Sequence, residues 1–499
     1  MRTLSKSKLL AFRQCPKRLW LEVHRPELRE DSSATQASFT VGHQVGDIAR
    51  KIYDPKSKGA LIDPQAEGFD AAFERTQELL KTAQPIFEAG FRAEGALSFA
   101  DVMQPVKKGG KLSWRMVEVK SSTSVKNYHL DDAAVQAFLA RSSGVPLAAI
   151  ALAHIDRSWV YPGNDDYSGL LMEVDLTGDV FGRDEEVTGW IGEAQQIVAK
   201  RKEPQISSGD HCNKPYACGF LGYCQSQAPQ AERPITWLPG RLSNALQVHI
   251  ETYDVTELDD VPDDLLNHLQ KRVRSVTLSG KPYFDKQALV GELAAYKLPG
   301  YFLDFETINF PVPIWKGTRP YQQIPFQFSV HRLSRTGRLE QEAFLDLSGN
   351  DPTVSFAQTL IGACGERGPI FVYNAGFETT RIRELAGRLP RLAKPLLALN
   401  ERVVDLWPLA RKHYYHPSQQ GSWSIKKVLP AVCPDLKYGD LEGVQDGGMA
   451  MEAFLEALAP QTSVERKAEI ERQLLSYCAL DTYAMVRLWA AFSGSRLKV

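Results

Sequence analysis

A hairpin predicted over residues 99–120 is the feature that most constrains the fold of the first half of the chain. Two β-type runs flank a turn that contains Gly109-Gly110, and a glycine pair between such runs favours a tight turn. A strand over 86–97 is expected to precede it, and a helix over 129–143 and a continuously apolar strand over 146–154 are expected to follow. We therefore expect an α/β domain with a mixed sheet flanked by helices.

Charged side chains on this hairpin indicate a chemical site. Asp101 lies on the first strand, and Glu118 and Lys120 lie on the second. Since side chains alternate along a strand, Glu118 and Lys120 share one face, whereas Val117 and Val119 are buried on the other. Two carboxylates that share a divalent cation, with a lysine beside the attacked phosphate, are what a metal-dependent phosphodiesterase requires.

Two further side chains are candidates for the same site. His43 lies on an expected helix that runs through Ile52, and its neutral imidazole is a possible third metal ligand. The alternative is a histidine that only satisfies a core hydrogen bond. Gln136 lies on the helix after the Glu118–Lys120 strand, where it is placed to hydrogen-bond the lysine or a phosphate.

The cysteines fall into two groups. Seven cysteines in a chain of 499 residues argue against a disulfide framework. The first group would staple the ends of the domain together through a 4Fe–4S cluster or a zinc ion: Cys15, Cys212, Cys218 and Cys224. His211 keeps zinc possible if Cys15 is not a ligand, and four unrelated thiols are the remaining alternative. The second group has apolar neighbours and is expected to be buried: Cys364, Cys433 and Cys478.

The first half of the chain resembles the RecB-type PD-(D/E)XK nucleases, and more narrowly the branch that includes the CRISPR-associated iron–sulfur nucleases. The resemblance covers about residues 1–228 and is carried by short motifs: Cys15-Pro16, Gly-x-x-x-Gly around His43, Ala-Asp-Val at 100–102, Glu-Val-Lys-Ser-Ser at 118–122 and Gln136-Ala137.

The resemblance implies a role for each residue. His43, Asp101 and Glu118 would bind Mg²⁺ or Mn²⁺, Lys120 would be the catalytic lysine, and Gln136 would begin the family's Gln-Ala-x-x-Tyr motif. It also favours an iron–sulfur cluster of structural role over zinc. The sequence departs from the family in two places: the tyrosine of that motif is missing, and the cysteine triplet is spaced more widely than the family's Cys-x2-Cys.

A second acidic site is expected where the α/β pattern restarts at Gly300. Helices are expected in this part of the chain over about 402–412, 448–459 and 464–493. Asp304 and Glu306 share one face of a strand, and two carboxylates this close repel each other unless a cation lies between them. Glu378 stands at the start of a helix that follows another strand. Tyr477 and Asp481 lie four residues apart on one helix face. The alternative is a set of unrelated surface acids.

These motifs resemble the DnaQ-like 3′–5′ exonucleases of RNase H-like fold, in the subtype with a Tyr-x-x-x-Asp third motif. The resemblance implies Asp304, Glu306 and Asp481 as ligands of two metal ions and Tyr477 as the group that orients the attacking water. The family's second motif ends in aspartate, and Glu378 stands at that position here; Asp405 is an alternative source of the acid. The whole layout resembles an uncharacterised bacterial family that fuses the two domains.

A loop that begins at Gly421 offers a further candidate for nucleic-acid binding. Trp423 would stack a base, and Lys426 and Lys427 would hold phosphates. The alternative is the start of a helix that is packed by Trp423.

The expected organisation is therefore two catalytic domains with a connection. Residues 1–230 form a PD-(D/E)XK restriction-endonuclease-like domain with a four-cysteine cluster, and residues 299–499 form an RNase H-like α/β domain of DEDD exonuclease type. Residues 231–298 form a connecting module with a strand over 246–250 and two helices.

The leading hypothesis is a metal-dependent deoxyribonuclease with two active sites, which acts on single-stranded or end-bearing DNA in preference to RNA. A net charge of −1 excludes a generally basic surface and requires local patches for nucleic acid. No apolar run reaches the length of a membrane span, so we expect a cytoplasmic protein without a membrane partner. The alternatives are a single-site nuclease whose C-terminal domain only binds nucleic acid, and a zinc-stapled scaffold without catalysis.

Overall fold

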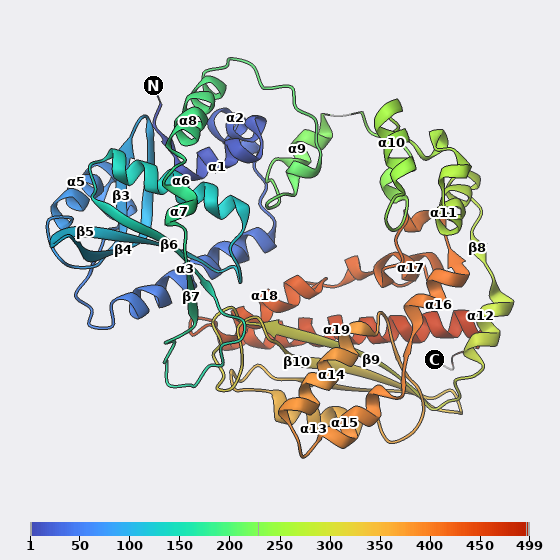
Figure 1. Cartoon of the computed structure of the whole chain (residues 1–499). Coiled ribbons are helices and arrows are strands. Elements are labelled where there is room, and N and C mark those ends of the chain that lie inside the picture. Colours follow the sequence, from blue (N-terminus) through green and yellow to red (C-terminus); the bar gives the residue numbers. More distant parts are fainter. Residues whose placement is uncertain (1, 228, 496, 498–499) are drawn as a thin grey trace. The chain divides into compact units, whose positions relative to one another are not determined.

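The chain divides into two compact units, each a mixture of helices and sheet as predicted (Figure 1). The computed structural model describes residues 2–227, 229–495 and 497. Unit 1 comprises Met1–Gln230 and Phe310–Gln322, and unit 2 comprises Ala231–Asn309 and Gln323–Val499. The expected connecting module is therefore part of unit 2.

Unit 1 is built on a mixed sheet in the order β2-β3-β4-β5-β6-β7, and β1 pairs with β4. Its strands are β1 (Leu4–Ser5), β2 (Ala60–Leu61), β3 (Ile86–Ala93), β4 (Ala96–Lys108), β5 (Lys111–Lys120), β6 (Leu147–Ile155) and β7 (Leu171–Asp175). Its α-helices are α1 (Lys6–Gln14), α2 (Pro16–His24), α3 (Ser33–Tyr53), α4 (Pro64–Glu67), α5 (Phe69–Leu79), α6 (Asn127–Ser142), α7 (Thr177–Val180), α8 (Asp184–Val198) and α9 (Leu221–Ser226).

The predicted hairpin is present, because Gly109 and Gly110 both adopt positive φ between β4 and β5. A second hairpin precedes it and was not predicted: the run expected as one strand over 86–97 turns at Glu94 and Gly95, which also have positive φ. Glutamate reaches this backbone region less easily than glycine, so the sequence pattern gave little warning of the turn.

The faces of β5 alternate as predicted. Val117 is buried in a cluster with Phe87 and Val102, which Tyr53 of α3 packs against. Met116 lies in the main core together with Ala133 and other residues of α6. Because Glu118 has the same parity as Met116, its side chain faces α6.

Residues 310–322, which separate two strands of the unit 2 sheet, form a strap that belongs to unit 1. Val312 is buried in a cluster with Val45 of α3 and Ile155 of β6. Backbone N–H groups of Tyr161 and Gly317 donate to the carbonyls of Thr318 and Tyr161 at 2.9 and 2.8 Å. The strap thus completes part of the unit 1 core.

Unit 2 contains a sheet in the order β11-β10-β9-β12-β13, in which β12 runs parallel to β9 and β13, while β10 is antiparallel to β9 and β11. The strands of unit 2 are β8 (Tyr283–Phe284), β9 (Gly300–Asn309), β10 (Gln323–Leu333), β11 (Leu339–Leu345), β12 (Ile370–Val372), β13 (Val403–Asp405) and β14 (Tyr414–Tyr415). Its α-helices are α10 (Asn244–Tyr253), α11 (His268–Ser279), α12 (Lys286–Leu293), α13 (Thr353–Ala363), α14 (Gly376–Arg388), α15 (Ala393–Asn400), α16 (Leu406–His413), α17 (Ile425–Val432), α18 (Gly447–Leu458) and α19 (Val464–Ser493).

Helices cover both faces of this sheet (Figure 1). Leu303 and Phe305 of β9 are buried in a cluster with residues of α13, α14 and α15. Phe302 points to the other face, where its ring lies 6.2 Å from that of Trp489 on α19. Asp304 and Glu306 share this parity, so β9 directs both acids toward the side of α19.

Two secondary-structure predictions for unit 2 were wrong. Residues 246–250 are not a strand but part of α10, because Ser243 caps this helix by accepting from the N–H of Leu246. The alternating pattern misled there, since Val248 is exposed rather than buried. The helix expected over 402–412 is divided into β13 and α16. By contrast, α18 and α19 lie within one residue of their predicted limits.

Within the described residues, no helix combines the length and the apolar character that crossing a bilayer would need.

Candidate functional sites

Unit 1 holds a buried network of two acids and two lysines. Lys120 donates to Glu118 and Asp132 at 2.6 and 2.7 Å. Lys6, the first residue of α1, lies 2.9 and 3.0 Å from the same two carboxylates. Burial opposes the charge on each lysine, but the paired acids outweigh it and raise the pKa of both lysines. Each of the two acids thus contacts both lysines, and the two negative charges are balanced by two positive charges.

Gln136 completes this network from α6. Its fully buried amide donates to Glu118 and, at 3.4 Å, to Asp132, and in the described part of the chain it forms no hydrogen bond with Lys120. Its Oε1 atom has no hydrogen-bond partner among the described residues. Gln136 therefore orients the carboxylate that the sequence predicts as a metal ligand, and it has one free acceptor.

Asp101 marks the point where two strands separate. The pairing of β4 with β5 reaches Val102 and Val117, and beyond it the Asp101 carboxylate accepts the backbone N–H of Val119 at 2.6 Å. Burial, and then the charge of Glu118, raises the pKa of Asp101 to about 8. The acid is therefore held in a position where a cation would relieve an electrostatic cost.

The predicted ligands of this site line one cavity of about 410 Å³, which also contains Lys120. His43 is exposed on α3, whereas Glu118 is buried. Among the described residues, however, the ligand atoms of His43, Asp101 and Glu118 do not all lie within 4.8 Å of one another. The Glu118 carboxylate is paired with Lys6 and Lys120, and the Asp101 carboxylate accepts the backbone N–H of Val119.

The site contains three further residues that were not predicted from the sequence: Asp132, Lys6 and Glu88. Asp132 lies four residues before Gln136 on α6, and this helical spacing was a usable signal. Lys6 reaches the site because β1 pairs with β4. This pairing joins residues about ninety positions apart, so the local sequence pattern does not predict it. Glu88 lines the same cavity from β3 with a positive φ of 56°, and burial followed by the charge of Glu118 raises its pKa.

The structure brings the four predicted cysteines together around one small cavity: Cys15, Cys212, Cys218 and Cys224. Gln14, one residue before the first cysteine, donates to the carbonyls of His211 and Tyr216 at 2.7 and 2.8 Å. The junction of α1 and α2 is thus fixed to a loop about two hundred residues later in the chain. His211 lies beside Cys212, with Nε2 3.6 Å from the sulfur.

The electrostatic setting of the cysteine cavity combines burial with nearby cations. Burial raises the pKa of Cys218 and Cys224, and the charges of Arg18 and Lys17 act in the opposite direction. Such cations favour bound thiolates once a metal centre displaces the protons. The other predicted group, Cys364, Cys433 and Cys478, is buried as expected.

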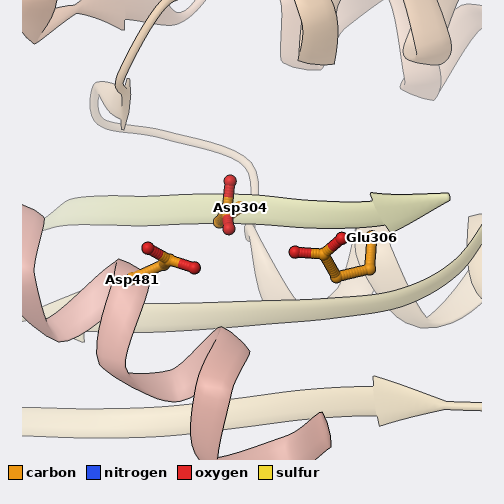
Figure 2. Close-up of side chains that lie close together, drawn as sticks. All are labelled: Asp304, Glu306 and Asp481. Carbon is orange, nitrogen blue, oxygen red and sulfur yellow. The ribbon is translucent and has the colours of Figure 1, made fainter. Parts of the chain in front are cut away.

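Unit 2 brings three predicted acids into one cluster, which we name the carboxylate cluster: Asp304, Glu306 and Asp481 (Figure 2). Two of them project from β9, and the third comes from α19. One oxygen from each carboxylate can be chosen so that all three lie within 4.8 Å of one another. Among the described residues, the carboxylate cluster is the group of three acids, histidines or cysteines whose ligand atoms come this close together.

The carboxylate cluster resists ionisation. Burial, and then the charges of Asp481, Glu306 and Glu378, raises the pKa of Asp304 well above its ordinary value. Burial followed by the charge of Asp481 raises the pKa of Glu306 to about 8, and burial raises that of Asp481 to about 6. Three acids in this state form a site for a cation.

Three other side chains border the carboxylate cluster. Tyr438 donates its hydroxyl to Asp481 at 2.5 Å. Tyr477 is buried one helical turn before Asp481 on α19, as predicted. Lys426 donates to the carbonyl of Gln445 at 2.6 Å and opposes the rise in pKa of the clustered acids. The sequence predicted Lys426 as a phosphate ligand, whereas Tyr438 was missed because its segment has no helical or strand pattern.

Glu378 and Asp405 differ in how their carboxylates are used. Glu378 lies in the first turn of α14, as predicted, and burial raises its pKa to about 8. Its buried Oε2 has no hydrogen-bond partner among the described residues. Asp405 accepts the N–H groups of Asn374, Ala375 and Trp407, each at 2.9 Å. Asp405 therefore caps the turns around it, while Glu378 retains a free ligand atom.

The predicted role of Trp423 was wrong. Its ring is buried, and its indole N–H donates to the carbonyl of Tyr414 at 2.8 Å. It packs the start of α17, which was the alternative expectation, and is unable to stack a base. Lys427 is exposed, and its ammonium group donates to the side-chain oxygen of Gln420 at 2.9 Å. This contact involves none of the side chains that border the carboxylate cluster.

Residues 301–424 match a protein family described as a domain of unknown function, DUF2779. The matched part begins on β9 and contains Asp304, Glu306 and Glu378, whereas Lys426, Tyr438 and Asp481 lie beyond it. No curated protein matches the chain. The similarity thus covers most of the unit 2 sheet and carries no activity with it.

Proposed function

We propose that this protein is a metal-dependent nuclease that hydrolyses phosphodiester bonds of DNA, with one active site in each unit. The observation that carries the proposal is the carboxylate cluster of unit 2, in which one oxygen each of the half-buried Asp304 and the buried Glu306 and Asp481 lie within 4.8 Å of one another. Protein sites hold Mg²⁺ and Mn²⁺ mainly through carboxylates, and acids this close are costly without a cation.

The residues around the carboxylate cluster fit this chemistry. A divalent cation bound there would offset charge on the phosphoryl group and lower the pKa of a bound water. Glu378 offers the buried, unpartnered oxygen of a fourth acid, which suits it as a further ligand. Tyr438 holds Asp481 in orientation, and Tyr477, on the same helix face, is placed to orient the attacking water.

The sheet order of unit 2 supports an RNase H-like assignment. The strand that carries Asp304 and Glu306 is central, with the antiparallel β10 on one side and the parallel β12 on the other. The third acid comes from the C-terminal helix α19. This arrangement agrees with the DEDD exonuclease resemblance, and Glu378 takes the place of the aspartate of that motif.

The buried network of unit 1 supports a second, PD-(D/E)XK-type site. Asp101 and Glu118 would hold a divalent cation, with His43 at the mouth of the same cavity. Lys120 would contact the phosphate, while Gln136 orients Glu118. The carboxylates of Asp132 and Glu118 keep Lys120 protonated, so that it serves as an electrostatic donor rather than a base.

The cysteine cavity fits a metal centre of structural role. Four sulfurs around one cavity match the donor set of a 4Fe–4S cluster, with zinc as the alternative. The resemblance of residues 1–228 to the iron–sulfur nucleases favours the cluster over zinc.

The test is hydrolysis of end-labelled and circular single-stranded DNA by the full chain with Mg²⁺ or Mn²⁺. Lys120→Ala and Asp304→Ala should each remove one separable activity. Lys111→Ala at the far end of β5 and Glu342→Ala on the exposed side of β11 are matched controls that should retain both. Absence of hydrolysis by the unaltered protein with either metal would overturn the proposal.

A second candidate function shares this experiment. The glutamate at position 378 in place of aspartate favours a unit 2 that binds strand ends without cutting them. In that case Asp304→Ala leaves hydrolysis unchanged, whereas Lys120→Ala abolishes it.

A further inference from the structure

Two neighbouring cavities of unit 2 share the side chains of Trp407 and Arg411 on α16. The larger has a volume of about 580 Å³ and is also lined by residues 421–425. The smaller has a volume of about 380 Å³ and is also lined by Arg272 and Lys412. We refer to the two cavities together as the α16 groove, whose size is that of a site for a small ligand or a few chain units.

The α16 groove is positively charged. Arg411 is half-buried, and its guanidinium carbon lies 5.1 Å from the ring centre of Trp407 and 6.0 Å from that of Trp423. In the described part of the chain, Arg411 and Arg272 form no ion pair, and no carboxylate lines either cavity. Lys412 is paired at the rim with Glu292 at 2.6 Å. A concave surface lined by arginines and by no carboxylate attracts an anion.

The α16 groove lies at the sheet edge that carries the carboxylate cluster. The strands β9, β12 and β13 are parallel, so their carboxyl ends meet at one edge. Tyr373 and Asn374 follow β12 and line the groove. Ile425 also lines it, and Lys426, the next residue, influences the clustered acids. One short segment thus borders both features.

The walls of the groove are fixed by hydrogen bonds. Asp405 accepts the N–H groups of Asn374 and Trp407, which ties one wall to the other. Tyr373 donates its hydroxyl to the carbonyl of Trp423 at 2.7 Å. A preformed site loses little conformational entropy when a ligand binds.

We infer that the α16 groove binds single-stranded nucleic acid, with an unpaired base stacked on Trp407 and a backbone phosphate held by Arg411. An aromatic face beside an arginine that forms no ion pair, as Arg411 is in the described part of the chain, is the combination that binds single strands without reading their sequence. A base inside a duplex is stacked on both faces and offers none to Trp407, so the strand must be single here. This inference rests on the proposed nuclease function and names its substrate class.

The test is photocrosslinking and binding of a thymine-rich oligonucleotide that contains 5-iodouracil, with the full chain in EDTA so that no cleavage occurs. Mass spectrometry should locate a crosslink at Trp407. Arg411→Gln should weaken binding about tenfold, and Arg411→Lys should recover part of that loss. Arg383→Gln, an exposed arginine on α14, is the matched control and should bind as the unaltered protein does.

The outcomes separate this inference from the proposed function. Crosslinks that avoid Trp407, together with equal binding by Arg411→Gln, overturn the inference even where hydrolysis is normal. A crosslink at Trp407 in a protein that hydrolyses no DNA supports the inference and overturns the nuclease proposal. Tighter binding of a fully paired duplex than of the single strand also contradicts the inference.

Discussion

At the scale of single residues, both sites consist of buried acids whose charge must be balanced. In unit 1 the balance comes from side chains of the protein itself, because Lys6 and Lys120 contact both Glu118 and Asp132. In unit 2 the three clustered acids have raised pKa values instead. The two sites therefore respond differently to substitution and to pH.

Lys6→Ala should lower the free energy of unfolding by about 2–4 kcal/mol, because it leaves the acids Glu118 and Asp132 with one cation. Lys8→Ala is the matched control from the same first turn of α1. Its side chain enters no ion pair in the described part of the chain, so the change should stay within about 0.5 kcal/mol. Urea denaturation measures both, and equal losses would contradict the assignment of Lys6 to the network.

Glu306→Gln should stabilise the metal-free protein at alkaline pH. The pKa of Glu306 rises from 4.5 to about 8 on folding, so between these values the folded state binds more protons than the unfolded state. Its contribution to stability is therefore lost as pH rises. In EDTA, the variant should exceed the unaltered protein by about 1–3 kcal/mol near pH 8.5, with the gap closing toward pH 5.

Urea denaturation at several pH values checks this expectation. A gap between the two proteins that is the same at every pH would contradict it. Added Mn²⁺ should stabilise the unaltered protein more than the variant, because a ligand that binds only the folded state raises its stability.

At the scale of elements, the sequence predicted most helices and strands but not how their ends are fixed. The long helix α19 has a regular apolar pattern and a serine cap, and its limits were predicted correctly. Residues 246–250 alternate like a strand, yet the Ser243 cap and the buried Leu246 select a helix. The three-residue strand β13 was predicted as the first turn of a helix, because α16 follows it directly.

The same contrast holds for the candidate sites. Asp304, Glu306 and Asp481 were predictable because spacing on a strand and a helix fixes the faces of their side chains. Lys6 and Tyr438 were not, because their places depend on tertiary contacts: the pairing of β1 with β4 and the hydrogen bond to Asp481. Trp423 was assigned to the surface because a loop pattern does not reveal packing against Tyr415.

The segment that lines the α16 groove should be sensitive to one methyl group. A Cβ atom at Gly421 would lie 1.9 Å from the carbonyl oxygen of Trp237, and φ of Gly421 is 79°. Gly421→Ala should therefore cost about 2–4 kcal/mol and displace the segment. Gly387→Ala in α14 meets no atom within 4 Å and should stabilise by up to about 1 kcal/mol.

Thermal or urea denaturation of the two glycine variants supplies the comparison. The expected changes have opposite signs, so a stability gain for both variants would contradict the placement of residues 421–425 against Trp237.

At the scale of the whole molecule, distant parts of the chain are joined at two places within unit 1. The cysteine cavity links the junction of α1 and α2 to the 212–224 region. The strap of residues 310–322 adds Val312 to the core, and the Tyr321 hydroxyl donates to the carbonyl of Ser121 at 2.5 Å, one residue after Lys120. Both links contribute to the stability of unit 1.

Cys218→Ala should abolish binding of the metal centre and lower the melting temperature of anaerobically purified protein, because metal binding contributes directly to folding. Cys364→Ala, in the core of unit 2, should retain the metal. Elemental analysis and visible absorbance distinguish iron from zinc. Equal metal content in the two variants would contradict the shared cysteine site, and a colourless protein with bound zinc would exclude the iron–sulfur cluster.

The strap also sets an order on synthesis. A ribosome completes the first 230 residues well before it reaches residues 310–322, and the nascent unit 1 waits with the place of Val312 empty until that stretch has emerged. By then β9, with Asp304 and Glu306, has already left the exit tunnel, whereas Asp481 is still to be made. Unit 1 is therefore completed during translation by residues 310–322, before unit 2 has all three acids of the carboxylate cluster.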